Sequence, residues 1–95
     1  EPKGSPLLTE GHAGPHRIQG IGANFVPGNL DKNVIDQFLD IEDDAAFAYA
    51  QAAARQEGLL VGISTGAVLA AVAGLLPTLP KASRVLALNF DTGER

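Results

Sequence analysis

The feature that most constrains the fold is an uncharged run, Leu59–Leu76 (LLVGISTGAVLAAVAGLL), in which the letters GISTG interrupt the apolar residues. Its length, about 18 residues, is the lower limit at which a membrane-spanning helix is considered. The small polar residues near its start favour instead a short strand, Leu59–Ile63, then a turn and a helix that ends at Pro77. We therefore expect no membrane span, and we expect Ser64 or Thr65 to cap the helix.

The segments around this run alternate between helix and strand patterns. Glu42–Glu57 (EDDAAFAYAQAAARQE) has acidic residues in its first turn and alanines in its middle, and Gly58 follows it, which together predict a helix. Val34–Ile41 and Arg84–Phe90 (RVLALNF) are short apolar runs typical of strands. This alternation predicts an α/β fold with parallel pairing, in which residues 34–95 form strand, helix, strand, helix and strand.

Residues 1–33 are rich in proline and glycine, which excludes a long helix and predicts a loop. A loop of this length in a compact domain is usually functional, and its glycines allow the backbone to approach a flat ligand closely. Gly20–Gly22 begins like a dinucleotide fingerprint, but Phe25 stands at the sixth position, so we do not predict NAD binding. His12 and His16 lie on this loop rather than on a helix face, so we expect no metal site.

Charge and composition argue against several classes of function. The chain has 95 residues, a formal net charge of −4 and no cysteine, and 5% of its residues are aromatic. The acidic balance and the lack of a basic stripe argue against nucleic-acid binding, and no disulfide or thiolate metal site can form. The absence of cysteine from the sequence suits a reducing cytoplasm. So few aromatic residues give a thin core, and we expect these residues to be part of a longer chain.

Several interpretations of Ser64 stay open from the residues alone. GISTG matches the G-x-S-x-G elbow of serine hydrolases, but that fold places its histidine after the serine, whereas both histidines here precede Ser64. The simplest interpretation is a helix cap. The third is a cofactor anchor for a phosphate or for an unprotonated ring nitrogen, because a helix N-terminus exposes N–H groups and a positive dipole end. Spacing alone does not choose between a phosphate and a ring nitrogen.

Two stretches closely resemble one enzyme family. Gly14–Asp31 (GPHRIQGIGANFVPGNLD) resembles the GPHKIQGIGAGFIPGNLD segment of O-acetylserine sulfhydrylase (cysteine synthase), and Gly62–Ala67 (GISTGA) resembles its GISSGA segment. Asp91–Arg95 (DTGER) is similar to a DSGER or SSGER segment near the family's C-terminus, and Glu1–Leu8 (EPKGSPLL) is similar to a segment that follows a strand. The resemblance covers residues 1–95 and identifies them as the C-terminal segment of the family's PLP-binding domain.

The resemblance implies a fold-type II enzyme, similar to the tryptophan synthase β subunit, that depends on pyridoxal 5′-phosphate (PLP). Such a transferase replaces the acetoxy group of O-acetylserine with sulfide in cysteine biosynthesis, giving cysteine and acetate. The family's usual state is a cytoplasmic homodimer that can bind serine acetyltransferase. A cystathionine β-synthase-like β-replacement enzyme shares these motifs and stays an alternative, as does a non-catalytic relative.

The resemblance also assigns roles to residues. Ser64 corresponds to the family's ligand of the pyridine nitrogen, and Gly20 to the glycine against the face of PLP. Thr92 lies where the family approaches the pyridine edge, and Gln19 and Ile21 shape the substrate pocket. A neutral hydroxyl at a helix N-terminus is not expected to hold the ring nitrogen protonated, which suits β-elimination.

Two residues depart from the family pattern, and the family's lysine is missing. Asn24 replaces a glycine at a position where asparagine tolerates a left-handed backbone, and Phe90 stands where a proline is common. The Schiff-base lysine and the GTGGT-type phosphate loop belong to the family's N-terminal half. The resemblance therefore places no catalytic residue within this segment, and we expect the 95 residues alone to be inactive.

Overall fold

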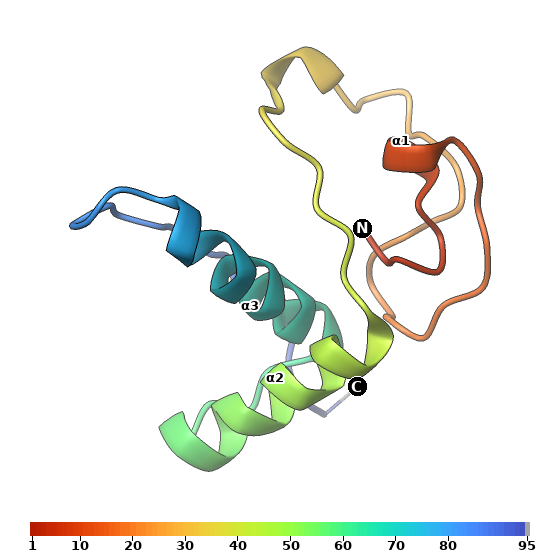
Figure 1. Ribbon diagram of the computed structural model, residues 1–95. Coiled ribbons are helices and arrows are strands. Elements are labelled where there is room, and N and C mark those ends of the chain that lie inside the picture. The colour runs from red at the N-terminus through yellow and green to blue at the C-terminus, as the bar shows by residue number, and fades with distance from the viewer. Residues whose placement is uncertain (95) are drawn as a thin grey trace.

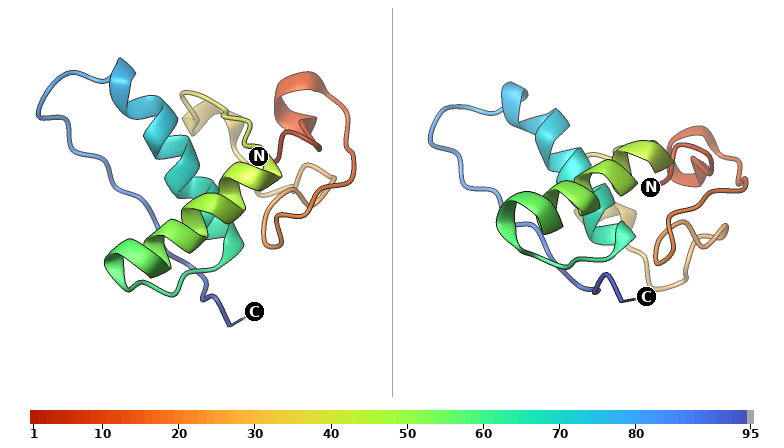
Figure 2. Two further views of the ribbon diagram at one scale, coloured as in Figure 1. Left: turned by 60° about the horizontal axis from the view of Figure 1, so that its bottom comes forward. Right: turned by 90° about the horizontal axis from the view of Figure 1, so that it is seen from below.

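The computed structural model describes residues 1–94 and consists of helices joined by irregular segments (Figure 1). Arg95, the last residue of the DTGER segment, lies outside the described residues. The α2 and α3 helices cross as a pair, with residues 1–42 on one side and the C-terminal segment on the other (Figures 1 and 2). The elements in chain order are α1 (Leu7–Glu10), the 3-10 turn η1 (Lys32–Val34), α2 (Asp43–Glu57), α3 (Ile63–Leu75) and the 3-10 turn η2 (Leu76–Thr78).

The helix predicted over Glu42–Glu57 is confirmed as α2. Asp43 and Asp44 lie in its first turn, where carboxylates interact favourably with the positive end of the helix dipole. Gly58 ends the helix in the left-handed conformation, with φ +68°, and its N–H donates to the carbonyl of Ala53.

The second predicted helix is present as α3, but the prediction of its cap was wrong. The N-cap is Gly62, and both Ser64 and Thr65 lie buried within the first turn. Neither hydroxyl caps the helix, because the carboxylate of Asp91, from the far end of the chain, occupies that position. No helix among residues 1–94 is long and apolar enough to cross a membrane.

A small core forms where α2, α3 and the N-terminal loop meet. Its buried side chains are Ile18, Ala46 and Ala67. The two helices approach closely at Gly66, where a Cβ would overlap the carbonyl oxygen of Ala46 and lie 3.0 Å from the Cβ of Ala50. Small residues on both helices therefore set the distance at which α2 and α3 pack.

The N-terminal region is a loop as predicted, except for the single helical turn α1. The carboxylate of Glu1 accepts hydrogen bonds from the N–H groups of Leu8 and Thr9, both at 2.9 Å. These bonds satisfy N–H groups that a helix start leaves free. This turn could not be predicted from sequence patterns, because Glu1 lies well outside the usual capping positions.

The strand predicted over Val34–Ile41 is not formed. The segment begins in η1 and continues irregularly, and it pairs only at an isolated parallel bridge between Ile41 and Pro2. At this bridge the N–H of Ile41 donates to the carbonyl of Glu1 at 2.9 Å. One bridge fixes the chain start beside the start of α2, but a strand needs a continuing ladder of such bonds.

The strands predicted over Leu59–Ile63 and Arg84–Phe90 are likewise absent from residues 1–94. Val61 forms an isolated antiparallel bridge with Thr92, and Arg84–Phe90 is irregular, with Leu86 90% exposed. A strand forms where a neighbouring strand pairs with its N–H and C=O groups, and the described residues offer none. The α/β class is therefore not seen in these residues, and the division of residues 34–95 into strands and helices stays a prediction.

Candidate functional site

The imidazole of His16 holds the Gly20–Gly22 loop in shape. The N–H of Ile18 donates to Nδ1 of His16 at 3.1 Å, so Nδ1 carries no proton. Nε2 lies 2.8 Å from the carbonyl oxygen of Gly22 and is therefore the protonated nitrogen, which donates. Both glycines have left-handed backbones, with φ +105° at Gly20 and +64° at Gly22, a conformation that glycine adopts readily.

Asn24, at the end of this loop, is hydrogen-bonded to Ser5 near the beginning of the chain. Its φ is +65°, which confirms that asparagine accepts the left-handed conformation expected here. Its Oδ1 accepts a hydrogen bond from Oγ of Ser5 at 2.5 Å, and Oγ of Ser5 accepts one from the N–H of Gly14 at 3.1 Å. Asn24 therefore replaces the family's glycine without disrupting the turn.

The loop rests directly on the start of α3. A Cβ built on Gly20 would lie 3.1 Å from Oγ and 3.3 Å from Cβ of Ser64, whose side chain is fully buried. The structure thus brings together the two residues to which the resemblance assigned the ring face and the ring nitrogen.

The carboxylate of Asp91 binds the first turn of α3. Its Oδ2 accepts a short hydrogen bond from Oγ of Ser64, and its Oδ1 accepts one from Oγ1 of Thr65 at 2.5 Å. Gly62 permits this approach, because a Cβ there would overlap the carboxylate. Burial alone raises the pKa of Asp91, but these hydroxyls and the backbone of Thr65 and Ser64 hold the pKa below its ordinary value of 3.8. The ionised carboxylate also faces the positive end of the α3 dipole.

Acid is expected to remove the stabilisation that Asp91 contributes. Its pKa is lowered in the folded state, so this contribution is complete above about pH 3.8 and is lost as the pH falls through the folded-state pKa. Asp91→Asn should remove this acid dependence and, near neutral pH, lower the free energy of unfolding by about 1 kcal/mol, as the loss of a helix cap does. Urea unfolding of the protein that carries this chain, measured across acidic pH, tests the expectation. Asp36→Asn, at an exposed position, is the control, and an unchanged acid dependence in Asp91→Asn would contradict it.

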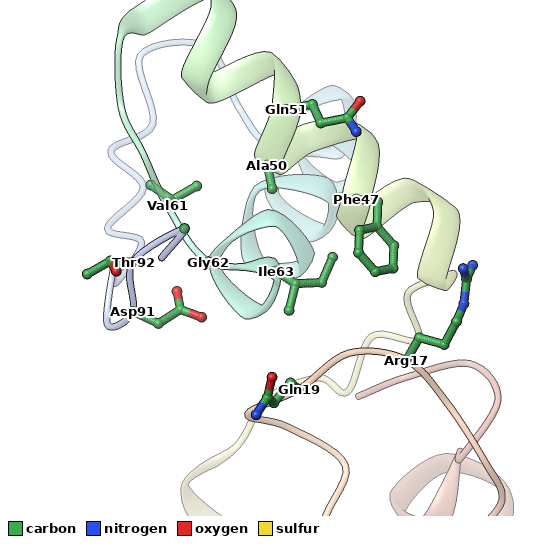
Figure 3. A pocket seen from close by; sticks show the side chains of 11 residues that line it. Arg17, Gln19, Phe47, Ala50, Gln51, Val61, Gly62, Ile63, Asp91 and Thr92 are labelled. Atoms are coloured by element: carbon green, nitrogen blue, oxygen red, sulfur yellow. The ribbon is translucent and has the colours of Figure 1, made fainter. Parts of the chain in front are cut away.

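A cavity of about 280 Å³ opens beside Asp91, lined in part by Gln19 and Thr92 (Figure 3). The Asp91 carboxylate points toward the space between Ile63 and Gln19, whereas the Thr92 side chain points away from it (Figure 3). Oγ1 of Thr92 accepts a hydrogen bond from the N–H of Glu94 at 3.2 Å. Asp91 thus turns its carboxylate toward the cavity, whereas the residue of this segment that the family resemblance assigned to the cofactor is Thr92.

A second cavity, of about 310 Å³, reaches Ser64 and Ile21. Both cavities lie near the lower end of the volumes found for small-molecule sites, about 300 Å³. The predicted residues are therefore divided between two neighbouring spaces, with Gln19 and Thr92 on one and Ser64 and Ile21 on the other.

Arg17 is a second site residue that the sequence motifs did not predict. Its guanidinium lies 5.1 Å from the ring centre of Phe47, and its Nη2 lies 2.7 Å from Oδ1 of Asp44. Its Nε lies 3.5 Å from Oδ2 of Asp43. These contacts hold Arg17 against the first turns of α2, at one side of the 280 Å³ cavity. Its only signal in the sequence was its place in the glycine loop motif.

The serine hydrolase interpretation has no support from the described residues. The Ser64 hydroxyl bonds to Asp91, and both ring nitrogens of His16 are engaged within the loop. A hydrolase serine needs a histidine base within hydrogen-bond reach. Within residues 1–94, no group of three or more His, Cys, Asp or Glu side chains is arranged to hold a metal ion.

Comparison with known proteins identifies the family. The family described as "Pyridoxal-phosphate dependent enzyme" matches residues 1–91. The chain belongs to this family of PLP-dependent enzymes. Cysteine synthase B of Campylobacter jejuni is 46% identical over 95 residues, which are 100% of this chain and 31% of that protein. The resemblance to cysteine synthases is thus confirmed, and the chain spans about a third of the length of the curated relatives it matches.

Solved structures of fold-type II PLP enzymes share this arrangement. O-ureido-L-serine synthase, at 38% identity, has a TM-score of 0.93 over 99% of this chain and 30% of that one. The O-acetylserine dependent cystathionine beta-synthase of Helicobacter pylori, at 42% identity, has a TM-score of 0.85 over 99% of this chain and 30% of that one. The chain is therefore part of a fold-type II PLP enzyme. The names of these neighbours differ in substrate, so the likeness alone does not fix the reaction.

The residue types at the site suit a flat ring cofactor, which would need the glycine loop and α3 to move apart, because Gly20 lies against the buried Ser64. Gly20 presents a backbone without a side chain, at φ +105°, to the buried hydroxyl of Ser64, so that only hydrogen atoms project from the loop there. The ionised Asp91 and the start of α3 supply the polar partners that a ring nitrogen needs. Bound PLP would be held by this end of α3 and by the glycine loop.

Proposed function

We propose that this chain forms one wall of the PLP site of a cysteine synthase, which replaces the acetoxy group of O-acetylserine with sulfide. The observation that carries the proposal is the contact between Gly20 and Ser64, which come from separate motifs and meet at the start of α3. The identity with Cysteine synthase B supports the choice of substrates. PLP, when bound, supplies the electron sink that β-elimination requires.

Each residue of the site has a separate task in this proposal. Ser64 contacts the pyridine nitrogen, and Gly20 leaves room for the face of the ring. Gln19 and Ile21, which line the two cavities, contact the substrate. Because Gly20 lies directly on the buried Ser64, we expect the Gln19–Gly22 loop to shift away from α3 when the cofactor binds.

The lysine that binds PLP is proposed to lie outside these residues. Lys3 pairs with Glu42 at 3.0 Å, and Lys32 and Lys81 are exposed and line neither cavity. We therefore expect the isolated 95 residues to be inactive. A cytoplasmic homodimer that binds serine acetyltransferase stays a prediction from the resemblance.

The visible absorption spectrum of the complete enzyme tests the proposal. PLP is expected to give a visible band that changes on adding O-acetylserine and returns on adding sulfide, with cysteine as product. Gly20→Ala should weaken PLP binding about ten-fold or more, because a side chain at φ +105° is strained by 1–3 kcal/mol, where about 1.4 kcal/mol is a factor of ten. Gly28→Ala is the matched control, since no atom lies within 4 Å of a Cβ built there. A spectrum without any visible band would contradict the proposal.

A second candidate function is cystathionine formation from O-acetylserine. It is favoured by the 42% identity to the O-acetylserine dependent cystathionine beta-synthase of Helicobacter pylori. The same preparation distinguishes the two when it is supplied with sulfide or with homocysteine and the thioether product is measured. Faster cystathionine than cysteine formation would favour the second candidate.

A further inference from the structure

We propose that His16 is a positioning residue whose imidazole holds both ends of the Gln19–Ile21 segment and so confines the opening for PLP to that segment. The inference rests on the proposed PLP site, because PLP needs Gly20 to separate from the buried Ser64. The family resemblance assigned no role to His16.

The imidazole of His16 bonds to the residues on both sides of this segment. Its Nδ1 accepts a hydrogen bond from the N–H of Ile18 at 3.1 Å, and its protonated Nε2 donates to the carbonyl oxygen of Gly22 at 2.8 Å. Ile18 and Gly22 directly flank Gln19–Ile21 in the chain. A single rigid ring therefore sets the distance between the two ends of the segment.

The first end of the segment is fixed in the core and on α2. The side chain of Ile18 is fully buried and belongs to the same core cluster as Ala46 and Ala67. One residue earlier, the N–H of Arg17 donates to Oδ2 of Asp43, in the first turn of α2, at 2.9 Å. A movement of this end would have to expose a core side chain and break that bond.

The second end of the segment lies between two rings. A Cβ built on Gly22 would lie 2.5 Å from Nε2 of His16 and 2.6 Å from Cγ of Pro2. Pro2 is itself fully buried, and its backbone pairs with Ile41 just before α2. Gly22 therefore has little room to move toward either ring.

The backbone that carries His16 is held where two parts of the N-terminal loop cross. A Cβ on Gly4 would lie 2.7 Å from the carbonyl oxygen of Pro15, and a Cβ on Gly14 would overlap the carbonyl oxygen of Gly4. The two backbones are thus in direct contact immediately before His16. The imidazole cannot follow a moving loop unless this crossing also comes apart.

The middle of the segment is the part that can move. The N–H of Ile21 donates to the carbonyl of Ile18 at 3.5 Å, which is longer than usual for such a bond. Gly20 has no side chain, so its backbone can rotate into conformations closed to other residues. We therefore expect Gly20 to leave Ser64 by a local rotation, while Ile18 and Gly22 stay in place.

Three substitutions of His16 in the complete enzyme separate its two hydrogen bonds. His16→Phe keeps a ring but neither bond. His16→Asn keeps an acceptor for the N–H two residues on, that of Ile18, and His16→Gln keeps a longer side chain that can donate to Gly22. The enzyme freed of PLP is titrated with PLP. Binding is expected to weaken about 10-fold in His16→Phe and about 3-fold in each of the other two variants, from the ordinary net contribution of such bonds.

Amide hydrogen exchange of the complete enzyme without PLP gives a readout that does not depend on activity. Exchange of the Ile18 N–H is expected to be about 3-fold faster in His16→Phe and His16→Gln, which remove its acceptor, and unchanged in His16→Asn. His12→Asn is the matched control, because His12 is exposed on the same loop. It should leave both the exchange and the affinity for PLP unchanged.

The outcomes separate this inference from the proposed function. If the unaltered enzyme binds PLP and His16→Phe binds it equally well, the role of His16 is overturned while the proposed PLP site stands. Binding as weak in His16→Asn and His16→Gln as in His16→Phe would also overturn it, because packing of the ring, rather than its two bonds, would then matter. If the unaltered enzyme gives no visible band with PLP, the proposed function fails and the inference with it. Should His16→Phe not fold, equal affinities for PLP in His16→Asn, His16→Gln and His12→Asn would overturn the inference.

Discussion

Replacing Gly66 with alanine is expected to lower the free energy of unfolding by about 3 kcal/mol, in the upper part of the range for overpacked cores. The added Cβ would overlap the backbone carbonyl oxygen of Ala46 and lie 3.0 Å from the backbone nitrogen of Ala50. Backbone atoms inside α2 cannot rotate away as a long side chain can, so the two helices would have to separate. Alanine also raises helix propensity by about 1 kcal/mol, which offsets only part of this cost.

Gly74→Ala is the matched control for Gly66→Ala. Both glycines lie in α3, but no atom lies within 4 Å of a Cβ built on Gly74. We expect Gly74→Ala to be neutral or to stabilise the protein by up to about 1 kcal/mol. Denaturant unfolding of both variants in the protein that carries this chain measures the difference. Equal free energies of unfolding would show that Gly66 does not set the packing of α2 against α3.

The helices could be predicted from the sequence because local patterns decide them. Acidic residues, an alanine-rich middle and Gly58 defined α2. The predicted strands are not formed among the described residues, because a strand depends on a neighbour that no local pattern reveals. Arg84–Phe90 has the composition of a strand but remains exposed and irregular among the described residues.

The site residues, like the helices and strands, were predicted where a local sequence motif marks them and missed where none does. Gly20 lies in a long motif and Ser64 in a shorter one, and the structure brings these two residues together. Asp91 was missed because its importance lies in where the chain turns back onto α3, not in its neighbours in sequence. The capping carboxylate comes from a residue 27 positions after Ser64 in the chain, so a search for a cap near the helix start could not find it.

Ser64→Ala in the complete enzyme is expected to leave PLP bound but to lower kcat by about 10- to 100-fold. The variant removes one hydrogen bond to a charged or polar partner at the ring, worth about 1.5–3 kcal/mol, and each 1.36 kcal/mol is a factor of ten in rate. Ser64→Asp should lower kcat further, because it places a second carboxylate beside Asp91 and changes the protonation of the ring. Steady-state kinetics with O-acetylserine, together with the absorption spectrum, measure both effects.

Thr65→Val separates a role at the cofactor from a role in capping α3. Thr65 and Ser64 each donate a hydrogen bond to Asp91, so Ser64→Ala and Thr65→Val both weaken the cap. In the proposed site only Ser64 contacts the ring. Similar losses of stability are therefore expected from the two variants, with the large loss of kcat confined to Ser64→Ala. Equal kcat values in Ser64→Ala and the unaltered enzyme would refute the contact, since a buried hydroxyl that only caps a helix has no separate effect on the chemical step.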